Sequence, residues 1–455
     1  MTDSPILICG AGIAGISVAY HLSVRHGIQG IILVDEHPPI SLTSDKSTEC
    51  YRNWWPGPGD AMVSLMNRSI DLLEELAESN HNAFHLNRRG YVYLTADQAK
   101  IPDLISAAEE SSELGAGPLR IHRGLPGDPA YLPSNPIAFT DQPTGADLLL
   151  DTTLIRHHFP YLSDNVVAAL HVRRAGWFSA QQLGAYLLDQ ARAHGVKLIR
   201  ARLTGIEVKE GGGFAIHLDD GNQLEASNFV NAAGPFLNNV SQMLGIELPV
   251  YCELHYKVGF KDQLGAVPRD APLLIWLDPQ TLSWSTEEQQ LLSSEDKSRW
   301  LLNELPPGVH TRPEGPADSP MILILWEYHT VVVKPVWPPP LDWDYPEISL
   351  RGLATMIPGL QVYIGKSPRP ALDGGYYTRT RENRPLIGPL PVEGAYVIGA
   401  LSGYGLMASL AAGELLAAHI TGNTLPPYAS AFSLSRYTDI SYQQLLADWG
   451  SSGQL

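Results

Sequence analysis

A short glycine-rich stretch near the N-terminus constrains the fold more than any other feature of this chain. The segment "ILICGAGIAGISVAYHLSV", which starts at Ile6, joins an apolar run to a helix-like run through three glycines in G-x-G-x-x-G spacing. A second apolar run, "IILV", follows and ends at Asp35. Short, fully apolar runs are typical of parallel strands that are buried on both faces. The order of strand, glycine turn, helix, strand and acid is the pattern of a dinucleotide-binding unit.

Each part of this pattern has a physical role. Gly10 permits the tight turn, Gly12 lets a pyrophosphate approach the backbone, and Gly15 lets the helix pack closely on the strand. The N-terminus of the helix offers free N–H groups and the positive end of its dipole to phosphates. Asp35 is placed to accept hydrogen bonds from ribose hydroxyls. The sequence therefore predicts that the chain binds a dinucleotide.

The composition narrows the possible partners. The chain has 455 residues, of which 44% are hydrophobic, and this length predicts two or three domains. A net charge of -17 repels phosphate backbones, so nucleic-acid binding is not expected. The three cysteines form no C-x-x-C pair and the fifteen histidines show no ligand spacing, so neither a disulfide framework nor a metal site is predicted. No basic region precedes the apolar run at Pro5, so we expect no signal peptide and a cytoplasmic location.

Two apolar stretches invite comparison with membrane spans. One is the opening stretch, and the other is "AYVIGALSGYGLMASLAAGELLAAHI", from Ala395. A glycine cluster interrupts each of them, and the second contains Glu414. Both are therefore predicted to be a buried strand, a turn and a helix, and no membrane span is expected.

The dinucleotide-binding unit is interrupted early and resumes much later. After Asp35 come a polar loop, an aromatic turn, an amphipathic helix from about Asp60 to Ser79 and an alternating strand from Gly90 to Ala96. A helix at Ala180–His194 and a strand at Lys197–Arg202 resume the sheet, followed by a three-stranded meander with turns at "GGG" and "DDGN". Nicotinamide enzymes usually continue their αβ units at once, so the interruption favours a flavin dinucleotide over a nicotinamide one.

Four blocks of the sequence carry a family resemblance. They are "GAGIAG" at the start, "NAAGPF" (Asn231 to Phe236), "TRENRPLIGPLP" (Thr380 to Pro391) and "GALSGYGLMASLAAGELL" (Gly399 to Leu416). Their order resembles the D-amino-acid oxidase (DAO) superfamily of FAD flavoproteins, in particular the sarcosine oxidase, glycine oxidase and dimethylglycine dehydrogenase branch. The set is specific for the superfamily and not for a substrate.

The resemblance implies an α/β fold, α+β overall. A Rossmann-like FAD-binding domain of the glutathione-reductase type is expected at residues 1–85, 165–245 and 370–455. An interleaved substrate domain, built on a mixed or antiparallel sheet, is expected at residues 86–164 and 246–369. It includes an extended segment rich in Trp and Pro at about 261–346, for which a lid, an interface, a substrate wall and a purely structural role all remain open.

The resemblance also implies which residues contact FAD. The turn and the acid bind the ADP half, the loop after the second strand lies against the pyrophosphate and ring, and the C-terminal turn aims N–H groups at the negative charge of the reduced ring. The implied contacts are Gly10, Gly12, Ile13, Ala14, Gly15, Asp35, Glu36, Ser44, Lys46, Ser47, Thr48, Leu203, Ala233, Gly234, Gly403, Tyr404, Gly405, Leu406 and Met407. For the C-terminal turn, simple packing on the sheet is the alternative.

Four residues are candidates for substrate handling by the same resemblance. Arg52 matches an arginine that holds a carboxylate, and the alternative is a structural salt bridge to Glu49. Tyr377 matches a second anchor position, and the alternative is a core tyrosine. Tyr256 and Lys257 lie on a strand that backs the substrate cavity in the family. Alternation places Lys257 on the face of His255 and Tyr256 on the other face, without showing which face meets the flavin.

The chain departs from the small sarcosine oxidases at two informative positions. Gly375 occupies the place of the cysteine that attaches FAD in those enzymes, so non-covalent FAD is predicted. Met407 replaces a lysine that helps to bind carboxylate, which puts a simple N-methyl amino acid in doubt.

The leading interpretation is an FAD-dependent oxidoreductase that oxidises a C–N bond of an amine or amino acid derivative. Hydride passes to flavin N5 and the resulting imine is hydrolysed; oxygen or an electron-transfer partner accepts the electrons. Oxidation of a 2-hydroxy acid, which needs a His base near the ring, is one alternative. A flavoprotein with an assembly role is another, and a nicotinamide dehydrogenase is a third. The sequence leaves open whether the chain forms a homo-oligomer.

Overall fold

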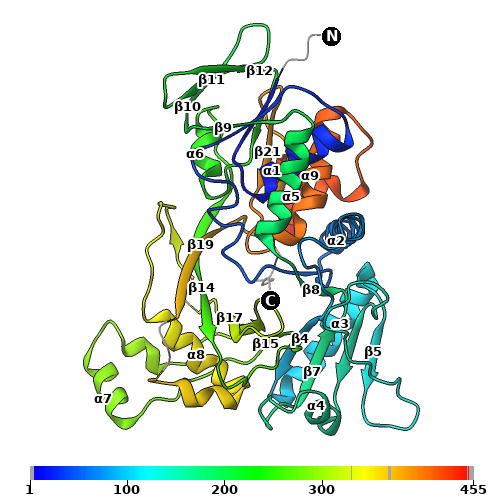
Figure 1. Ribbon diagram of the computed structural model, residues 1–455, viewed down its shortest axis with the longest axis vertical. Coiled ribbons are helices and arrows are strands. Elements are labelled where there is room, and N and C mark those ends of the chain that lie inside the picture. The colour runs from blue at the N-terminus through cyan, green and yellow to red at the C-terminus, as the bar shows by residue number, and fades with distance from the viewer. Residues whose placement is uncertain (1–4, 329, 367–369, 448, 450–455) are drawn as a thin grey trace.

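The computed structural model describes residues 5–328, 330–366, 370–447 and 449. The chain forms two bodies, one above the other in Figure 1, each built on its own sheet. The upper body holds the dinucleotide motif and the last long helix, and the lower body holds the large sheet. The long strands β14 (Tyr251–Lys261) and β19 (Ala371–Arg379) pair with each other and run between the two bodies.

The upper body contains a six-stranded sheet with the order β20-β21-β13-β1-β2-β9. Four of its five strand pairs are parallel, and only β20 pairs antiparallel. Its strands are β1 (Ile6–Cys9), β2 (Ile31–Asp35), β9 (Lys197–Arg200), β13 (Asn228–Asn231), β20 (Leu386–Pro389) and β21 (Ala395–Gly399). This is the Rossmann-like arrangement that the glycine motif predicts.

Side-chain alternation along β1 explains why the sheet is covered on both faces. Ile6 and Ile8 belong to the core beneath the helices, whereas Leu7 and Cys9 belong to the core beneath the meander. The helices are α1 (Ile13–Tyr20), α5 (Ala180–Ala193) and α9 (Gly405–Thr421), and the meander is β10 (Leu203–Val208), β11 (Phe214–Leu218) and β12 (Gln223–Ala226). Burial of each large apolar side chain stabilises the fold by about 1.5–3 kcal/mol.

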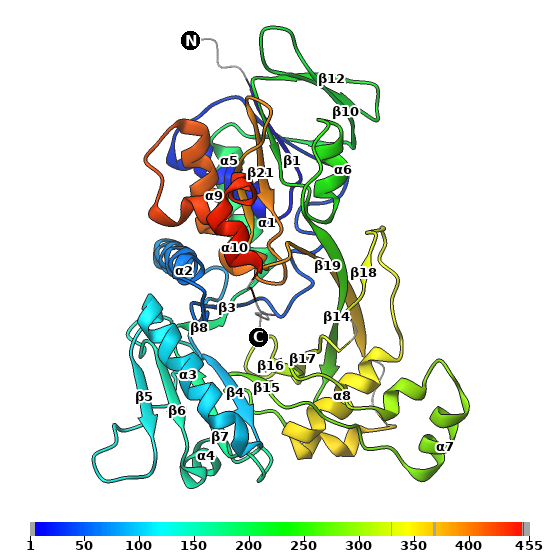
Figure 2. The same ribbon diagram turned by 180° about the vertical axis from the view of Figure 1, so that it is seen from behind.

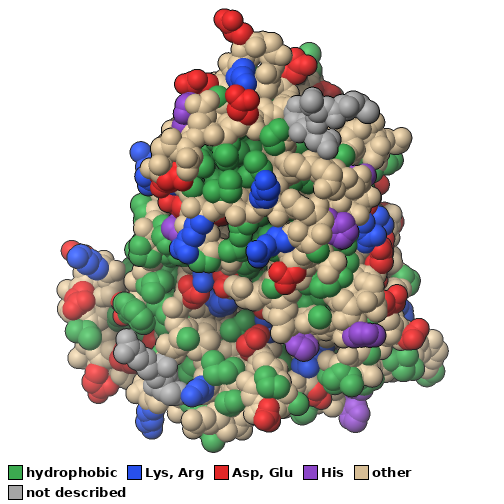
Figure 3. Space-filling model, turned by 45° about the horizontal axis from the view of Figure 1, so that its top comes forward, with side chains coloured by type: hydrophobic (Ala, Val, Ile, Leu, Met, Phe, Trp, Pro, Cys, Tyr) green, Lys and Arg blue, Asp and Glu red, His purple; other side chains and the backbone are tan. Residues whose placement is uncertain are grey.

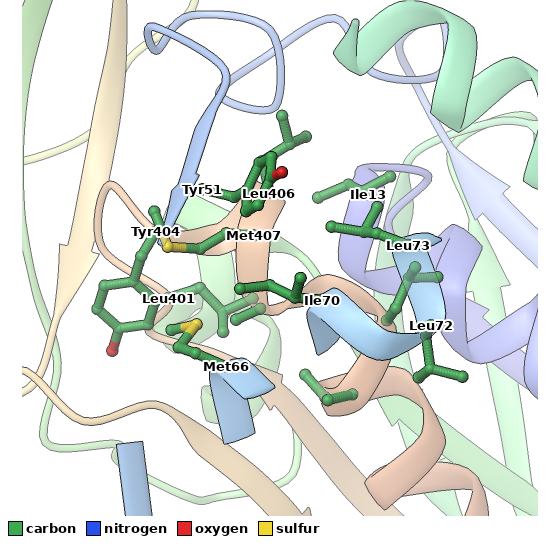
Figure 4. Packing of buried hydrophobic residues seen from close by; sticks show 14 of the residues in the cluster. Ile13, Tyr51, Met66, Ile70, Leu72, Leu73, Leu401, Tyr404, Leu406 and Met407 are labelled. Atoms are coloured by element: carbon green, nitrogen blue, oxygen red, sulfur yellow. The ribbon is translucent and has the colours of Figure 1, made fainter. Parts of the chain in front are cut away.

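Helix α2 (Ala61–Ser79) closes the upper body against the lower one. Its apolar stripe, which includes Met66 and Ile70, packs against Leu401, just before α9, and against Met407 at the start of α9 (Figure 4). Arg68 of α2 and Glu414 of α9 form an ion pair at the edge of this contact. The first part of α9 is therefore held in place by burial on several sides.

The lower body contains a ten-stranded mixed sheet. Its order is β18-β14-β17-β16-β15-β4-β7-β6-β5, with β19 also paired to β14. The remaining strands are β4 (Tyr91–Thr95), β5 (Leu119–His122), β6 (Ala146–Leu149), β7 (Ala168–Val172), β15 (Leu273–Trp276), β16 (His310–Pro313), β17 (Met321–Leu325) and β18 (Val332–Val333). Two of its pairs, β4 with β15 and β5 with β6, are parallel, and the others are antiparallel. The mixed sheet agrees with the predicted fold class.

Shorter elements complete the molecule, seen from behind in Figure 2. A two-stranded ribbon of β3 (Cys50–Arg52) and β8 (Ala175–Trp177) lies where the two bodies meet. The other helices are α3 (Ile101–Ser111), α4 (Thr152–His158), α6 (Leu237–Gln242), α7 (Thr286–Ser294), α8 (Tyr345–Met356) and α10 (Ile440–Ala447).

The predicted domain ranges stay a prediction, and the sheets refine their edges. Strand β7 lies within the predicted FAD-binding range 165–245 but pairs in the large sheet, and β19 does the same within 370–455. The Trp/Pro-rich segment supplies β15, β16, β17 and β18 to that sheet. Much of this segment therefore has a structural role in the large sheet.

Two further sequence expectations concern the surface and the membrane. Acidic and basic side chains are interspersed over the face shown in Figure 3, and no continuous basic region crosses it. Among the described residues, no helix combines the length and apolarity that a membrane crossing requires. The described part of the chain also holds no group of three His, Cys, Asp or Glu side chains arranged for a metal ion.

Candidate functional site

A cavity of about 550 Å³ opens at the carboxyl ends of β1, β2 and β13. In open α/β sheets ligands bind at this edge, where the strand order reverses. Eight of the residues predicted to contact the cofactor line this cavity: Gly10, Gly12, Asp35, Glu36, Ser44, Leu203, Ala233 and Gly234. These residues come from four separate parts of the chain, and the fold brings them together.

The backbone shapes this end of the cavity. Gly10 has a φ of 112°, and a Cβ atom built there would lie 2.3 Å from the carbonyl oxygen of Ala232. A Cβ atom at Gly15 would lie 2.0 Å from the carbonyl oxygen of Gly10. Side chains at either position would push the turn, α1 and β13 apart, so the close packing that the motif predicts is present.

Two side chains fix the loops beside this turn. The Asp35 carboxylate accepts hydrogen bonds from the backbone N–H of Ala11 at 2.7 Å and of His37 at 2.8 Å. The Ser44 hydroxyl accepts a hydrogen bond from the N–H of Ile13 at 3.0 Å. Asp35 therefore holds the turn and the end of β2 together, and its carboxylate remains at the cavity wall.

A second, smaller cavity of about 90 Å³ continues from the first. The two share Gly12, Ser44 and Gly234, so we treat them as one elongated trough with a dinucleotide end and a ring end. The ring end is lined by further predicted residues, namely Ile13, Ala14, Ser47, Tyr377, Gly403, Gly405 and Leu406. These lining residues are the ones that the family resemblance assigns to the surroundings of the flavin ring.

The start of α9 supplies the electrostatics of the ring end. The helix has 17 residues and begins without a side-chain cap. Within the described part of the chain, the N–H groups of Gly405 and Leu406 have no hydrogen-bond acceptor. Free N–H groups at a helix N-terminus stabilise negative charge, which a reduced flavin ring carries. The residues present at both ends of the trough therefore fit FAD.

Five of the predicted cofactor residues do not line the trough. One of them is Gly15, where α1 packs closely on the turn. Lys46 forms ion pairs with Asp45 at 3.2 Å and with Asp373 at 2.8 Å. The carbonyl of Thr48 accepts a hydrogen bond from Arg312. Tyr404 and Met407 are buried in the core (Figure 4). Direct cofactor contact stays a prediction for these five residues and for those that line the trough.

Arg52 is buried, but it does not pair with Glu49. The Glu49 carboxylate lies 3.5 Å from Arg312, so the proposed salt bridge to Arg52 is replaced by one to Arg312. The Arg52 guanidinium lies 4.6 Å from the ring centre of Trp55, and its Nε donates to the carbonyl of Trp54. It lines a third cavity, described below, and Tyr377 lines the ring end of the trough. The two predicted anchors thus face different cavities.

Tyr377 is buried at 3% exposure and stacks on His255, with ring centres 3.9 Å apart. Within the described residues its hydroxyl has no hydrogen-bond partner, and burial raises the pKa of that hydroxyl, which therefore stays protonated. Both ring nitrogens of His255 face carboxylates: Nε2 lies 3.4 Å from Glu253 and Nδ1 lies 3.6 Å from Glu327.

The structure decides which face of β14 meets the cofactor loop. Lys257 donates a hydrogen bond from Nζ to the carbonyl of Asp45, in the loop that lines the trough. Burial lowers the pKa of this lysine, although Glu49 and Asp45 partly offset the effect. Tyr256 lies on the opposite face and packs against Tyr345 of α8. The site therefore includes Lys257 as a support of the loop, and Tyr256 is turned away from it.

Some residues of the site were not anticipated from the sequence. A cavity of about 250 Å³, which we call the aromatic cavity, is lined by Arg52, Trp54, Trp55, Met62, Tyr93, Leu104, Ala107, Leu170, Leu277, Glu382, Asn383, Arg384 and Trp449. Asn383 and Arg384 belong to the block "TRENRP", which contributed to the resemblance but was given no role. No local pattern connects them to Trp55 or Tyr93, because tertiary contacts alone bring these residues together.

Comparison with known proteins supports the interpretation that the trough is an FAD site. The model of the FAD dependent oxidoreductase family, DAO, matches residues 5–419. The chain is similar to human mitochondrial dimethylglycine dehydrogenase, with 22% identity over 316 residues, or 66% of this chain and 32% of that protein. The match thus spans about a third of the length of this curated relative.

Solved structures share the fold. L-Proline dehydrogenase from P. horikoshii aligns with a TM-score of 0.71 and 18% identity, covering 96% of this chain and 98% of that one. Glycine oxidase from Geobacillus kaustophilus aligns with a TM-score of 0.72 and 16% identity, covering 95% and 98%. Together with the family match, these results confirm the predicted fold class and the predicted FAD cofactor.

Proposed function

Because this chain belongs to the FAD dependent oxidoreductase family, we propose that it oxidises a C–N bond of an amine or amino acid derivative. Four relatives or solved structures support this class by name, since dimethylglycine, proline, glycine and iminodiacetate are all amino acids or their derivatives. Another solved structure of the same fold is named for L-α-glycerophosphate, which is an alcohol. The observation that carries the proposal is the ring end of the trough. It joins the open N-terminus of α9 to the hydroxyl of the buried Tyr377, for which the described residues supply no partner.

The reaction suits the groups that the chain provides there. When bound, FAD supplies the two-electron acceptor. The Tyr377 hydroxyl is placed to donate a hydrogen bond to a polar atom of a molecule bound at the ring end, because no described residue accepts from it. The start of α9 lies where it stabilises negative charge beside the substrate. Positioning and electrostatics are the contributions that these residues can make.

The surroundings of His255 favour an amine over a 2-hydroxy acid. Oxidation of an alcohol calls for a base that takes the hydroxyl proton. Both nitrogens of His255 face Glu253 and Glu327, so this histidine is not directed at the trough. A neutral amine brings its own lone pair and needs no such base. The carboxylate contacts of His255 therefore support the C–N reaction.

We also propose that FAD is held without a covalent link. At Gly375, the position that would carry a linking cysteine, a Cβ atom would lie 2.8 Å from the Cβ of Lys46. The loop that carries Lys46 thus fills the space that a linking side chain would need. Acid precipitation of the purified protein should release all of the yellow colour into the supernatant. Flavin that remains in the pellet would contradict the non-covalent proposal.

The function is tested by reduction of bound FAD in the absence of oxygen. The purified protein is mixed with a panel of secondary amines and amino acids, and in parallel with 2-hydroxy acids, while absorbance near 450 nm is followed. We expect amines to bleach the flavin and hydroxy acids to leave it unchanged. Bleaching by hydroxy acids alone would overturn the proposal. FAD that is bound but reduced by neither set would point to the assembly role.

A further inference from the structure

The aromatic cavity lies beside the ring end of the trough and has its own lining. The ring of Trp55 meets the ring of Tyr404 edge-on, with centres 5.3 Å apart. Tyr404 is flanked by Gly403 and Gly405, which line the ring end. The turn that carries Tyr404 therefore lies between the lining of the ring end and the lining of the aromatic cavity. A substrate that reacts at the ring end has the aromatic cavity as its neighbour.

The two walls of the aromatic cavity differ in chemistry. The lower body contributes an apolar wall, which includes Leu104 and Ala107 of α3, Leu170 of β7 and Leu277 after β15. The upper body contributes Trp55, Asn383 and Arg384. A ligand that fills this space must therefore have an apolar group and a polar group. The volume of about 250 Å³ is close to the lower limit of small-molecule pockets and far above the space of one water molecule.

Arg384 is the strongest sign that the polar group is an anion. It is 6% exposed, and among the described residues no carboxylate forms an ion pair with it. Its Nη2 donates to the carbonyl of Pro58 at 2.6 Å and its guanidinium lies 4.7 Å from the ring centre of Trp449. In the described part of the chain, its Nε has no hydrogen-bond partner. A buried guanidinium that lacks a counter-charge is costly to keep, unless a ligand supplies the charge.

Three other lining residues also have a buried polar atom that finds no partner among the described residues. These atoms are Nε1–H of Trp55, Oδ1 of Asn383 and Oε2 of Glu382. Native proteins pair nearly all such atoms, so four of them around one cavity, counting Nε of Arg384, is an informative departure. The other oxygen of Glu382, Oε1, is paired with Arg436 at 2.7 Å, and Glu382 forms no ion pair with Arg384.

We propose that the aromatic cavity binds the side group of the substrate, which is an amino acid that carries an aromatic or branched apolar group together with a carboxylate. The apolar group contacts Leu104, Ala107 and Leu277, and the carboxylate accepts hydrogen bonds from Arg384 and from Trp55. The inference rests on the proposed function for the reaction, and on the cavity alone for the binding.

Binding is tested first, with a probe that cannot be oxidised. Phenylacetate carries the ring and the carboxylate without the amine, and acetate lacks the ring. Calorimetry with the FAD-loaded protein should show that phenylacetate binds at least tenfold more tightly than acetate. Ala107→Leu narrows the cavity and should lower the affinity for phenylacetate about tenfold. Ser106→Leu, on the same helix but exposed and outside the cavity, should change the affinity by less than about twofold.

Arg384→Gln tests the polar end of the cavity. This substitution should lower the affinity for phenylacetate about tenfold. The affinity for benzyl alcohol, which has no charge, should stay within about twofold of the wild-type value. This comparison keeps the result independent of any loss of folding, because both probes use the same protein sample. Equal loss for both probes, or equal affinity of wild-type protein for phenylacetate and acetate, would overturn the inference.

Reduction of FAD is tested second, with phenylalanine and N-benzylglycine as large substrates and N-methylglycine as the small one. We expect phenylalanine and N-benzylglycine to reduce FAD with a lower KM than N-methylglycine. Ala107→Leu should raise the KM for these two large substrates and leave the KM for N-methylglycine unchanged. A preference for N-methylglycine that Ala107→Leu leaves unchanged would overturn the inference but not the proposed function. Tight phenylacetate binding without reduction by any amine would overturn the proposed function and leave the cavity assignment intact.

Discussion

The dinucleotide end of the trough and the aromatic cavity are built in opposite ways. At the dinucleotide end the chain uses backbone: Gly10, Gly12 and Gly15 shape the surface, and Asp35 is the main polar side chain. The aromatic cavity uses side chains almost throughout, and they come from both bodies of the molecule. The first kind of site depends on the fit of a few neighbouring residues, and the second depends on many distant ones.

This difference predicts how the two regions respond to substitution. A site made of backbone fails when a single Cβ atom is added, because the backbone has no alternative position. A site made of side chains loses affinity gradually, since each side chain contributes one contact of several. The predictions below use matched substitutions to test this contrast, beginning with the largest expected effect.

Gly10→Val should abolish FAD binding. The new side chain would meet the carbonyl of Ala232, where even a Cβ atom lies 2.3 Å away, and the φ of 112° is unfavourable for valine. The measurement is the ratio of flavin to protein after purification, followed by titration with FAD. The control is Gly259→Ala, whose Cβ would find its nearest neighbour at an ordinary 3.4 Å. An affinity of Gly10→Val for FAD within about threefold of the wild-type affinity would contradict the contrast between the two kinds of site.

Glu382→Gln should lower the free energy of unfolding by about 3 kcal/mol at pH 7, because it leaves the buried Arg436 without a counter-charge. Burial alone raises the pKa of Glu382, but the charge of Arg436 and the hydroxyl of Tyr437 outweigh burial and hold that pKa below its usual value. A depressed pKa contributes stability above the ordinary carboxyl pKa of about 4.3, and this stability is lost as the pH falls further.

The difference between wild type and Glu382→Gln in thermal midpoint should therefore be constant from pH 7 to about pH 5 and shrink at lower pH. Glu225→Gln is the control, since Glu225 forms an exposed ion pair with Lys209 and should cost less than about 1 kcal/mol. A difference that grows as the pH falls would contradict the assigned charge state.

Asp35→Asn should weaken FAD binding about 10–30-fold. The amide keeps the shape of the carboxylate but loses the charge that strengthens its hydrogen bonds to Ala11 and His37, and to a bound ribose. The measurement is a fluorescence titration of FAD. Glu36→Gln is the matched control: it also lines the trough, but its carboxylate lies only near His37, at 3.8 Å, so we expect less than a threefold effect.

Tyr377→Phe should lower kcat/KM for the amine substrate about fivefold and leave the thermal midpoint unchanged, because no described residue bonds to the hydroxyl. Tyr376→Phe is a matched contrast at nearly the same burial. Its hydroxyl bonds to the backbone of Val336 at 3.1 and 3.0 Å, so its loss should lower the thermal midpoint. A drop in midpoint for Tyr377→Phe that equals the drop for Tyr376→Phe would assign Tyr377 to structure instead of substrate.

The sequence by itself determined the dinucleotide end. The three glycines, the two apolar runs and Asp35 lie within the 30 residues from Ile6 to Asp35, and the motif needs only that local order to form its turn and its helix start. The predicted helices at Asp60–Ser79 and Ala180–His194 are present as α2 and α5 with ends shifted by one residue. Hydrophobic period and capping are local properties, which is why these elements could be predicted.

Tertiary structure alone decided the rest of the site. The face of β14 that meets the cofactor loop, the pairing of Glu49 with Arg312 and the meeting of Trp55 with Arg384 each join residues far apart in the sequence. Alternation along a strand gives two equal faces, and only packing against another body distinguishes them. Local sequence patterns determine the backbone conformation that each segment prefers. The side chains of a substrate cavity come from distant segments, and the topology of both sheets brings them together.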